Sequence, residues 1–201
     1  MITAPVNATD DILVRLRNET RPEHDAIEAA LDLMTPGLSR TVYGQQLARF
    51  YGFYQPLENS LARLVNWSEF GLDFHLRRKT ALLADDLNYL GIDAGATLPV
   101  CLTLPPLTSV AAGFGCAYVL EGATLGGQLI SWHVTHTLGL NGLQGARFFN
   151  CYGDRTGMMW KAFRAALVGF AVSPAAKNEV VASAIATFDS LRCWCLAGKP
   201  A

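Results

Sequence analysis

The sequence carries little net charge and few charged residues of either sign. Its 201 residues include 16 lysines and arginines against 17 aspartates and glutamates, a formal net charge of -1. Chains that bind nucleic acid or anionic membranes usually gather basic residues in one region, so we expect neither partner. Because charged residues make up 16% of the chain and apolar residues 51%, the composition predicts a packed core rather than disorder.

The chain also lacks the patterns of a zinc site, a disulfide framework, a signal peptide and a membrane span. Its five cysteines are odd in number and include no zinc-type Cys-x-x-Cys pair. No stretch offers about 18 uninterrupted apolar residues, and no basic start leads into an apolar run. We therefore expect free thiols and a cytoplasmic protein that does not enter membranes.

Apolar residues spaced three and four apart predict helices along the chain, and no segment alternates as a strand does. The predicted helices cover about residues 11–18, 20–33, 39–65, 76–90, 113–137, 144–151, 156–170 and 174–195. Thr20 and Glu23 have the spacing of a capping box at the start of the second helix. Pro56 is expected to kink the third.

These helices predict an all-α fold, a single-domain helical bundle over residues 1–201. The proline-containing run 91–106 is interpreted as a connector inside that domain, and the basic run Arg77-Arg-Lys79 as a solvated helix start. Flexible ends are expected at 1–10 and 196–201.

The predicted helix 113–137 contains glycines where a helix interior disfavours them. Each interior glycine costs roughly 0.5–1 kcal/mol relative to alanine, yet this segment holds Gly122, Gly126 and Gly127. Glycines four residues apart leave one helix face without side chains. That face can accept a second helix or a flat ligand at close range, and it permits a bend. Spacing alone leaves both interpretations open.

His24 has neighbours that suit a metal ligand. Glu28 follows one helical turn later and can accept a hydrogen bond from the imidazole nitrogen that does not bind the metal. Arg17 precedes His24 by two turns, so it can reach the carboxylates of a ligand held there. A His–Glu pair on a helix is also a common surface hydrogen bond, so the interpretation depends on the rest of the chain.

Five blocks occur in order between about residues 12 and 170. They are Arg17…Thr20-x-x-x-His24-x-x-x-Glu28, Phe50-Tyr-Gly-Phe-Tyr-Gln-Pro-Leu-Glu58, Lys79…Asp86-Leu87…Leu90-Gly91, Tyr118-Val-Leu-Glu-Gly-Ala-Thr-Leu-Gly-Gly-Gln128 and Trp160-Lys-Ala-Phe163. In order and spacing they resemble the haem oxygenase family, most closely the bacterial members that accompany bacteriophytochromes. Each block by itself is weak, and the combination is specific.

The resemblance implies a haem, haem b, held between a proximal helix and a kinked distal helix. His24 would be the axial iron ligand, and the distal helix would be 113–137. Gly122, Gly126 and Gly127 would let the distal backbone approach the haem and leave room for dioxygen. The implied reaction is oxidative cleavage of haem to biliverdin with release of carbon monoxide and ferrous iron. Haem is then both substrate and cofactor.

The resemblance also implies roles for other side chains and for partners. Arg17, and Lys161 or Arg164 on the helix 156–170, would pair with the haem propionates. Tyr54 would join the distal hydrogen-bond network, a core aromatic being the alternative. The remaining implied contacts are Glu28, Tyr118 and Thr124. A separate reductase, such as a ferredoxin or flavoprotein, would supply electrons because the sequence has no flavin or dinucleotide fingerprint. A bacteriophytochrome would receive the bilin.

One position departs from the family pattern. Ala123 follows the first distal glycine, where mammalian-type members have aspartate and bacteriophytochrome-associated members usually have serine. Ordered water would have to be held by carbonyls or by Tyr54 and Thr124. Because of this departure, a second function remains an alternative: a haem carrier or sensor that does not cleave haem. A third alternative is another reaction on the same fold, such as hydrolysis of a thiamin-related compound, with Cys116 and Glu121 as the nearby reactive groups.

Overall fold

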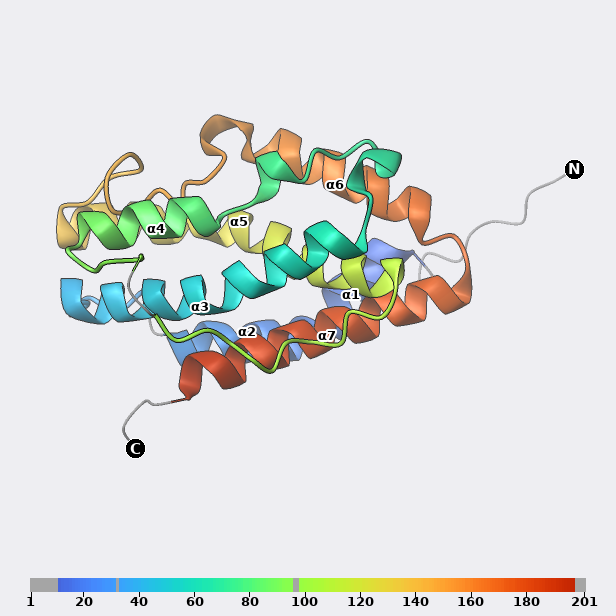
Figure 1. Ribbon diagram of the computed structural model, residues 1–201, viewed down its shortest axis with the longest axis horizontal. Coiled ribbons are helices and arrows are strands. Elements are labelled where there is room, and N and C mark those ends of the chain that lie inside the picture. Colours follow the sequence, from blue (N-terminus) through green and yellow to red (C-terminus); the bar gives the residue numbers. More distant parts are fainter. Residues whose placement is uncertain (1–10, 32, 96–97, 198–201) are drawn as a thin grey trace, which may run out of the picture.

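The computed structural model describes residues 11–31, 33–95 and 98–197, and within these ranges no β-strand occurs. The α-helices are α1 (Ile12–Glu19), α2 (Arg21–Leu31), α3 (Arg40–Leu64), α4 (Thr80–Tyr89), α5 (Val110–Leu138), α6 (Thr156–Phe170) and α7 (Pro174–Leu196) (Figure 1). Short 3-10 helices are η2 (Trp67–Phe70), η3 (His75–Arg77) and η4 (Gly153–Arg155). The all-α prediction is confirmed. The expectations for 1–10 and 198–201 lie outside the described residues.

None of the helices in the described part of the chain combines the length and the apolar content that a bilayer crossing requires.

The central helix α5 packs closely along α7 through its N-terminal half. A Cβ at Gly115 would come within 2.4 Å of the Val180 carbonyl oxygen, so only glycine allows the two backbones to approach this far. The Ser183 hydroxyl of α7 donates to the Ala112 carbonyl of α5 at 2.8 Å. Phe114, on the other side, is fully buried and stacks on another aromatic ring. The first half of α5 is therefore enclosed by protein.

The helix α3 continues through Pro56. Proline has no N–H, so the carbonyl of Gly52 loses its helical donor. The backbone N–H of Cys101 donates to that carbonyl instead, at 2.8 Å. A Cβ at Gly52 would lie 2.3 Å from the Pro99 carbonyl oxygen. The connector after α4 is thus packed against α3 at the proline, where its backbone takes over the missing hydrogen bond.

The prediction of a helix at 144–151 is wrong. The Asn141 side-chain oxygen accepts hydrogen bonds from the backbone of Leu143 and Gln144, both at 2.9 Å, which folds the segment into turns. Gly145 then has a φ of 82°, in the left-handed region that interrupts a helix. The spacing of apolar residues did not reveal that the Asn141 side chain and the Gly145 backbone conformation would prevent a helix here.

The predicted capping box is also wrong. The Thr20 hydroxyl donates to the Leu16 carbonyl at 2.7 Å, and the Thr20 backbone N–H donates to the same carbonyl at 3.1 Å. The Thr20 carbonyl accepts a hydrogen bond from the His24 N–H of α2 at 3.0 Å, but among the described residues no hydrogen bond joins Thr20 to Glu23.

Candidate functional site

A cavity of about 400 Å³ lies between α2 and α5 and reaches α3, α6 and α7. Its volume is within the range of small-molecule and cofactor pockets. Aromatic side chains form much of the wall, namely Phe50, Phe148, Phe149, Trp160 and Phe188. Such walls suit a flat, apolar ligand because rings bury large areas against one another.

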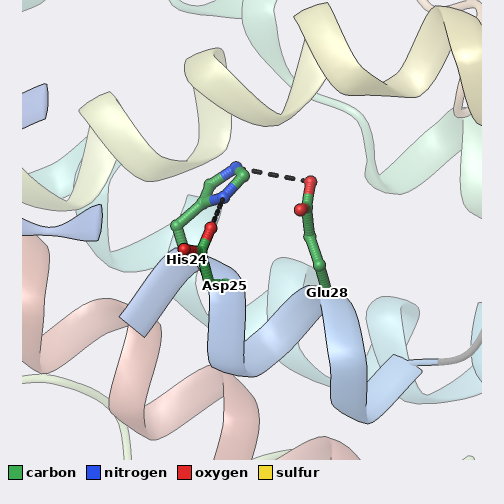
Figure 2. Close-up of side chains that lie close together, drawn as sticks. All are labelled: His24, Asp25 and Glu28. Carbon is green, nitrogen blue, oxygen red and sulfur yellow. Dashed lines mark ion pairs between the residues drawn. The ribbon is translucent and has the colours of Figure 1, made fainter. Parts of the chain in front are cut away.

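His24 lies on α2, and its imidazole rises toward α5 (Figure 2). Its Nε2 is 3.6 Å from Glu28 Oε1, and its Nδ1 is 3.7 Å from Asp25 Oδ1. Phe188 meets the ring edge-on at 5.8 Å between centroids. If Nε2 binds a metal, the carboxylate beside the other nitrogen belongs to Asp25 rather than to Glu28. The sequence interpretation missed Asp25, although it directly follows the histidine.

Two of the three predicted distal glycines face the cavity. A Cβ at Gly126 would meet nothing within 4 Å, and one at Gly122 would meet only a Trp160 ring atom at 3.9 Å. Gly127 is different, because a Cβ there would lie 2.7 Å from the Phe149 carbonyl oxygen. The ligand interpretation of the glycine face therefore fits Gly122 and Gly126, whereas Gly127 serves backbone packing and does not line the cavity.

Two hydroxyl side chains predicted for the distal side, Tyr54 and Thr124, line the cavity. Thr124 lines the cavity, and its hydroxyl donates to the Glu121 carbonyl at 2.7 Å, which leaves the oxygen free to accept. Tyr54 is buried in the cavity wall, and no described group hydrogen-bonds its hydroxyl. Burial raises the pKa of Tyr54 above its ordinary value, partly offset by the charge of Lys79, so the phenol keeps its proton. Ala123 contributes only a methyl group.

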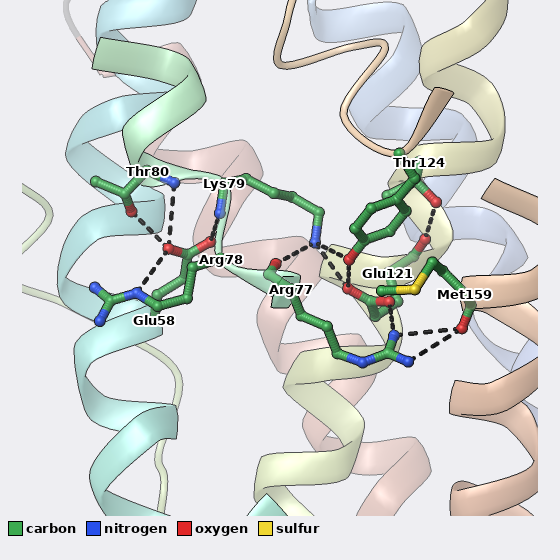
Figure 3. Close-up of polar contacts among 9 residues, drawn as sticks. Glu58, Arg77, Arg78, Lys79, Thr80, Glu121, Thr124 and Met159 are labelled. Carbon is green, nitrogen blue, oxygen red and sulfur yellow. Dashed lines mark hydrogen bonds and ion pairs between the residues drawn. The ribbon is translucent and has the colours of Figure 1, made fainter. Parts of the chain in front are cut away.

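A buried ionic cluster fixes α5 just before Gly122 (Figure 3). Glu121 accepts hydrogen bonds from Lys79 Nζ at 2.8 Å and from the Tyr152 hydroxyl at 2.7 Å, and it pairs with Arg77. Burial alone would lower the pKa of Lys79, but Glu121 and Tyr152 raise it above the ordinary value, so the amine stays charged. The interpretation of Arg77 and Lys79 as a solvated helix start is wrong, because 95% or more of each is buried.

Sequence comparison connects this arrangement to one family. A family model described as heme oxygenase matches residues 10–196. A heme oxygenase of Xanthomonas campestris pv. campestris (strain 8004) is 32% identical over 161 residues, which cover 78% of this chain and 90% of that protein. The chain belongs to the haem oxygenase family. The predictions of a haem-degrading enzyme and of the family are thereby confirmed.

Solved haem oxygenases share the fold. The NO- and CO-bound enzyme of Neisseria meningitidis has a TM-score of 0.79 at 21% identity, covering 92% of this chain and 90% of that one. The Leptospira interrogans enzyme has a TM-score of 0.74 at 21% identity, covering 93% and 99%. The enzyme of the cyanobacterium Synechocystis sp. PCC6803, solved in complex with heme, has a TM-score of 0.71 at 15% identity, covering 92% and 90%.

The cavity residues fit a haem. His24 offers an axial nitrogen, the aromatic wall suits the porphyrin, and the open space at Gly126 would be filled by any larger side chain. Arg17 lies exposed at the rim, near the half-buried Tyr118, whose pKa is raised by burial and lowered in part by Arg17 and Thr20.

Three residues predicted from the resemblance lie elsewhere. Gly127 packs on backbone, and neither Lys161 nor Arg164 lines the cavity. The Arg164 guanidinium instead lies over the Trp160 ring, 5.9 Å from its centre.

The groups considered for an unrelated reaction are enclosed by protein. Cys116 is fully buried and outside the cavity lining, where the Thr187 hydroxyl donates to its sulfur at 3.0 Å. Burial raises the pKa of Cys116, which disfavours the nucleophilic thiolate. Glu121 is held in its ionic cluster. The cavity thus gains no nucleophile from either residue.

Proposed function

We propose that this chain cleaves haem b to biliverdin and releases carbon monoxide and ferrous iron. The observation that carries the proposal is that His24 and the side-chain-free face at Gly122 and Gly126 line one cavity from opposite helices. When bound, haem supplies the iron that activates dioxygen.

The proximal side and the rim bind and orient the substrate. His24 Nε2 points into the space between α2 and α5, and Asp25 beside Nδ1 can fix the ring orientation. Arg17 and Arg21 line the rim, where their charges attract propionate groups. Phe148 and the other aromatic residues of the lining would exclude water from a bound porphyrin.

Proton delivery on the distal side has no carboxylate or hydroxyl at position 123 to use. The Tyr54 hydroxyl keeps its proton and has no protein partner among the described residues, so it can donate to a water in the cavity. The Thr124 oxygen can accept a hydrogen bond from a cavity water, because its own proton is donated to the Glu121 carbonyl. Ala123 adds room rather than a polar group.

The partners in this proposal are a separate reductase, such as a ferredoxin or a flavoprotein, and a bacteriophytochrome that receives the bilin. Both come from the sequence resemblance.

The test is titration of the purified chain with haemin, followed by ascorbate and air, read by absorption. We expect one haem per chain with a histidine-ligated spectrum, then loss of the haem band and growth of a bilin band. His24→Ala should remove the histidine-ligated spectrum, whereas His75→Ala, at an exposed position outside the cavity, should not. Haem that survives prolonged reduction in air would contradict the enzymatic proposal.

Ala123 favours one second candidate, a haem carrier or sensor without turnover. In that case the wild-type chain binds haemin through His24 but forms no bilin. Ala123→Ser, which returns a hydroxyl to the distal face, then separates an impaired enzyme from a carrier: bilin formed only by the variant identifies a distal defect, and bilin formed by neither identifies a carrier.

A further inference from the structure

We propose that His24, Asp25 and Glu28 form a binding site for a divalent transition-metal ion that does not require haem, and that this site receives ferrous iron as it leaves the cavity. The metal site stands on the geometry of α2 alone. The exit role rests on the proposed cleavage of haem.

The carboxylates of Asp25 and Glu28 flank the His24 imidazole, one beside each ring nitrogen (Figure 2). One ligand atom from each residue lies within 4.8 Å of the other two. The closest pair, His24 Nε2 and Glu28 Oε1, is separated by 3.6 Å. Two donors at that separation can each lie about 2.1 Å from one ion, with an angle a little wider than tetrahedral. Asp25 supplies the third donor after a side-chain rotation.

The donor set suits iron and related ions. Imidazole binds iron, zinc and nickel, and carboxylates bind manganese and other hard cations, so one imidazole with two carboxylates selects a first-row divalent ion. Water can complete the coordination because the three side chains are 46%, 52% and 64% exposed for His24, Asp25 and Glu28.

The position of the site gives released iron a route to solvent. Haem iron would be held at Nε2, the imidazole nitrogen nearest Glu28. A linear tetrapyrrole no longer encloses the ion, so the ion can exchange pyrrole nitrogens for nearby oxygen ligands without any change in oxidation state. Glu28 offers such an oxygen at the cavity wall, and Asp25 offers another at the exposed surface of the same helix.

The positive charge of Arg21 opposes this site. Arg21 Nε lies 2.8 Å from Asp25 Oδ1 and 2.9 Å from Oδ2, so a metal must compete with the guanidinium for that carboxylate. The competition makes a directional test available, because removing Arg21 should tighten metal binding while removing Asp25 should weaken it.

The experiment uses the haem-free protein. Anaerobic titration with Fe²⁺ in competition with a chromogenic chelator, repeated with Co²⁺ as an air-stable probe, should show one saturable site per chain. Asp25→Asn and Glu28→Gln should each weaken binding about tenfold or more, and His24→Ala should abolish it. Arg21→Gln should tighten it severalfold. Glu69→Gln, which removes an exposed carboxylate far along the chain, should have no effect.

A titration that does not saturate, or one unaffected by both carboxylate variants, would overturn the metal site. Haemin binding by the wild-type chain is measured separately, so that loss of the metal site and loss of the haem function are distinct results. Haemin should also displace Co²⁺ one for one, because both need His24. For the exit role, chelator capture of iron after a single turnover should be slower in Asp25→Asn than in wild type, because the variant lacks the surface ligand of the route; an equal or faster rate would contradict it.

Discussion

Glycine has opposite structural roles in the two halves of α5. In the N-terminal half, a Cβ at Gly113 would lie 2.7 Å from Val65, and one at Gly115 would lie 2.4 Å from Val180. In the C-terminal half, the corresponding atoms at Gly122 and Gly126 face open space. Every one of these glycines lowers helix propensity by a similar amount. In the packed half, Gly113 therefore admits the Val65 side chain and Gly115 admits the α7 backbone, whereas Gly122 and Gly126 of the open half make room for a ligand.

Glu121 lies at the boundary between the two halves. It is almost fully buried and binds two cations, Arg77 and Lys79, that come from the segment before α4. The cluster holds the end of the packed half in a fixed position, so that the open half begins at a defined place.

The largest predicted effect on stability comes from removing the charge of Glu121 at this boundary. Glu121→Gln leaves Arg77 and Lys79 buried without their shared counter-charge, and we expect the free energy of unfolding to fall by about 3–5 kcal/mol. Urea denaturation followed by circular dichroism measures it. Glu69→Gln, at an exposed position, is the control and should change stability by less than about 0.5 kcal/mol. A loss in Glu121→Gln no larger than the control's would show that the cluster does not anchor α5.

The second prediction concerns the packed half. Gly115→Ala places a methyl group against two backbone atoms of α7, the Val180 carbonyl oxygen at 2.4 Å and the Ala184 nitrogen at 2.9 Å. Because backbone cannot move as a flexible side chain does, overpacking should outweigh the gain in helix propensity and cost about 2 kcal/mol net. Urea denaturation again reports the change. Stability equal to or above that of wild type would mean that α7 moves away without cost.

The sequence predicted the helices better than the segments between them. Helix periodicity depends on residues three and four apart, which are visible in sequence, and it located α3, α5, α6 and α7 within a few residues. The errors arose where one side chain competes with the backbone. Asn141 begins the turns that replace the helix predicted at 144–151, and the Thr20 hydroxyl bonds back to Leu16 of α1 rather than to Glu23 of α2.

Residues predicted from local signals line the cavity, whereas the burial of residues with distant partners could not be predicted. His24, Gly122 and Gly126 were identified from spacing and resemblance, and all line the cavity. Arg77 gave no sign of burial, because its partner Glu121 is 44 residues away. Gly127 could not be told apart from its neighbour, since only the packed structure shows which glycine faces backbone.

The third prediction concerns the open half of α5, where replacing glycine by alanine should raise the free energy of unfolding rather than lower it. Gly126→Ala meets nothing within 4 Å, so the haem-free protein should be more stable by about 0.5–1 kcal/mol through reduced unfolded-state entropy. The same methyl group enters the cavity, so haemin affinity should fall several-fold. Denaturation and haemin titration on one preparation measure both. Unchanged haemin binding would contradict the assignment of this face to the ligand.

The smallest predicted effect concerns Tyr54 on the cavity wall, whose hydroxyl has no hydrogen-bond partner among the described residues. Burial raises the pKa of its hydroxyl in the folded state. Below about pH 10, the ordinary tyrosine pKa, this hydroxyl is protonated in both the folded and the unfolded state, and the stability of the fold is not reduced by its ionisation. Above that pH the unfolded state loses its proton and the folded state keeps it, so stability falls as pH rises.

Tyr54→Phe removes this dependence. Between pH 9 and about pH 10.5, the variant should lose less stability than wild type by somewhat under 1 kcal/mol, measured by urea denaturation at each pH. Other ionisable groups contribute equally to both proteins, so the difference isolates one hydroxyl. Tyr51→Phe, at a half-buried position outside the cavity lining, is the matched control. Identical pH profiles for Tyr54→Phe and wild type would mean that water in the cavity solvates the Tyr54 phenolate. The wall at Tyr54 would then be accessible to solvent.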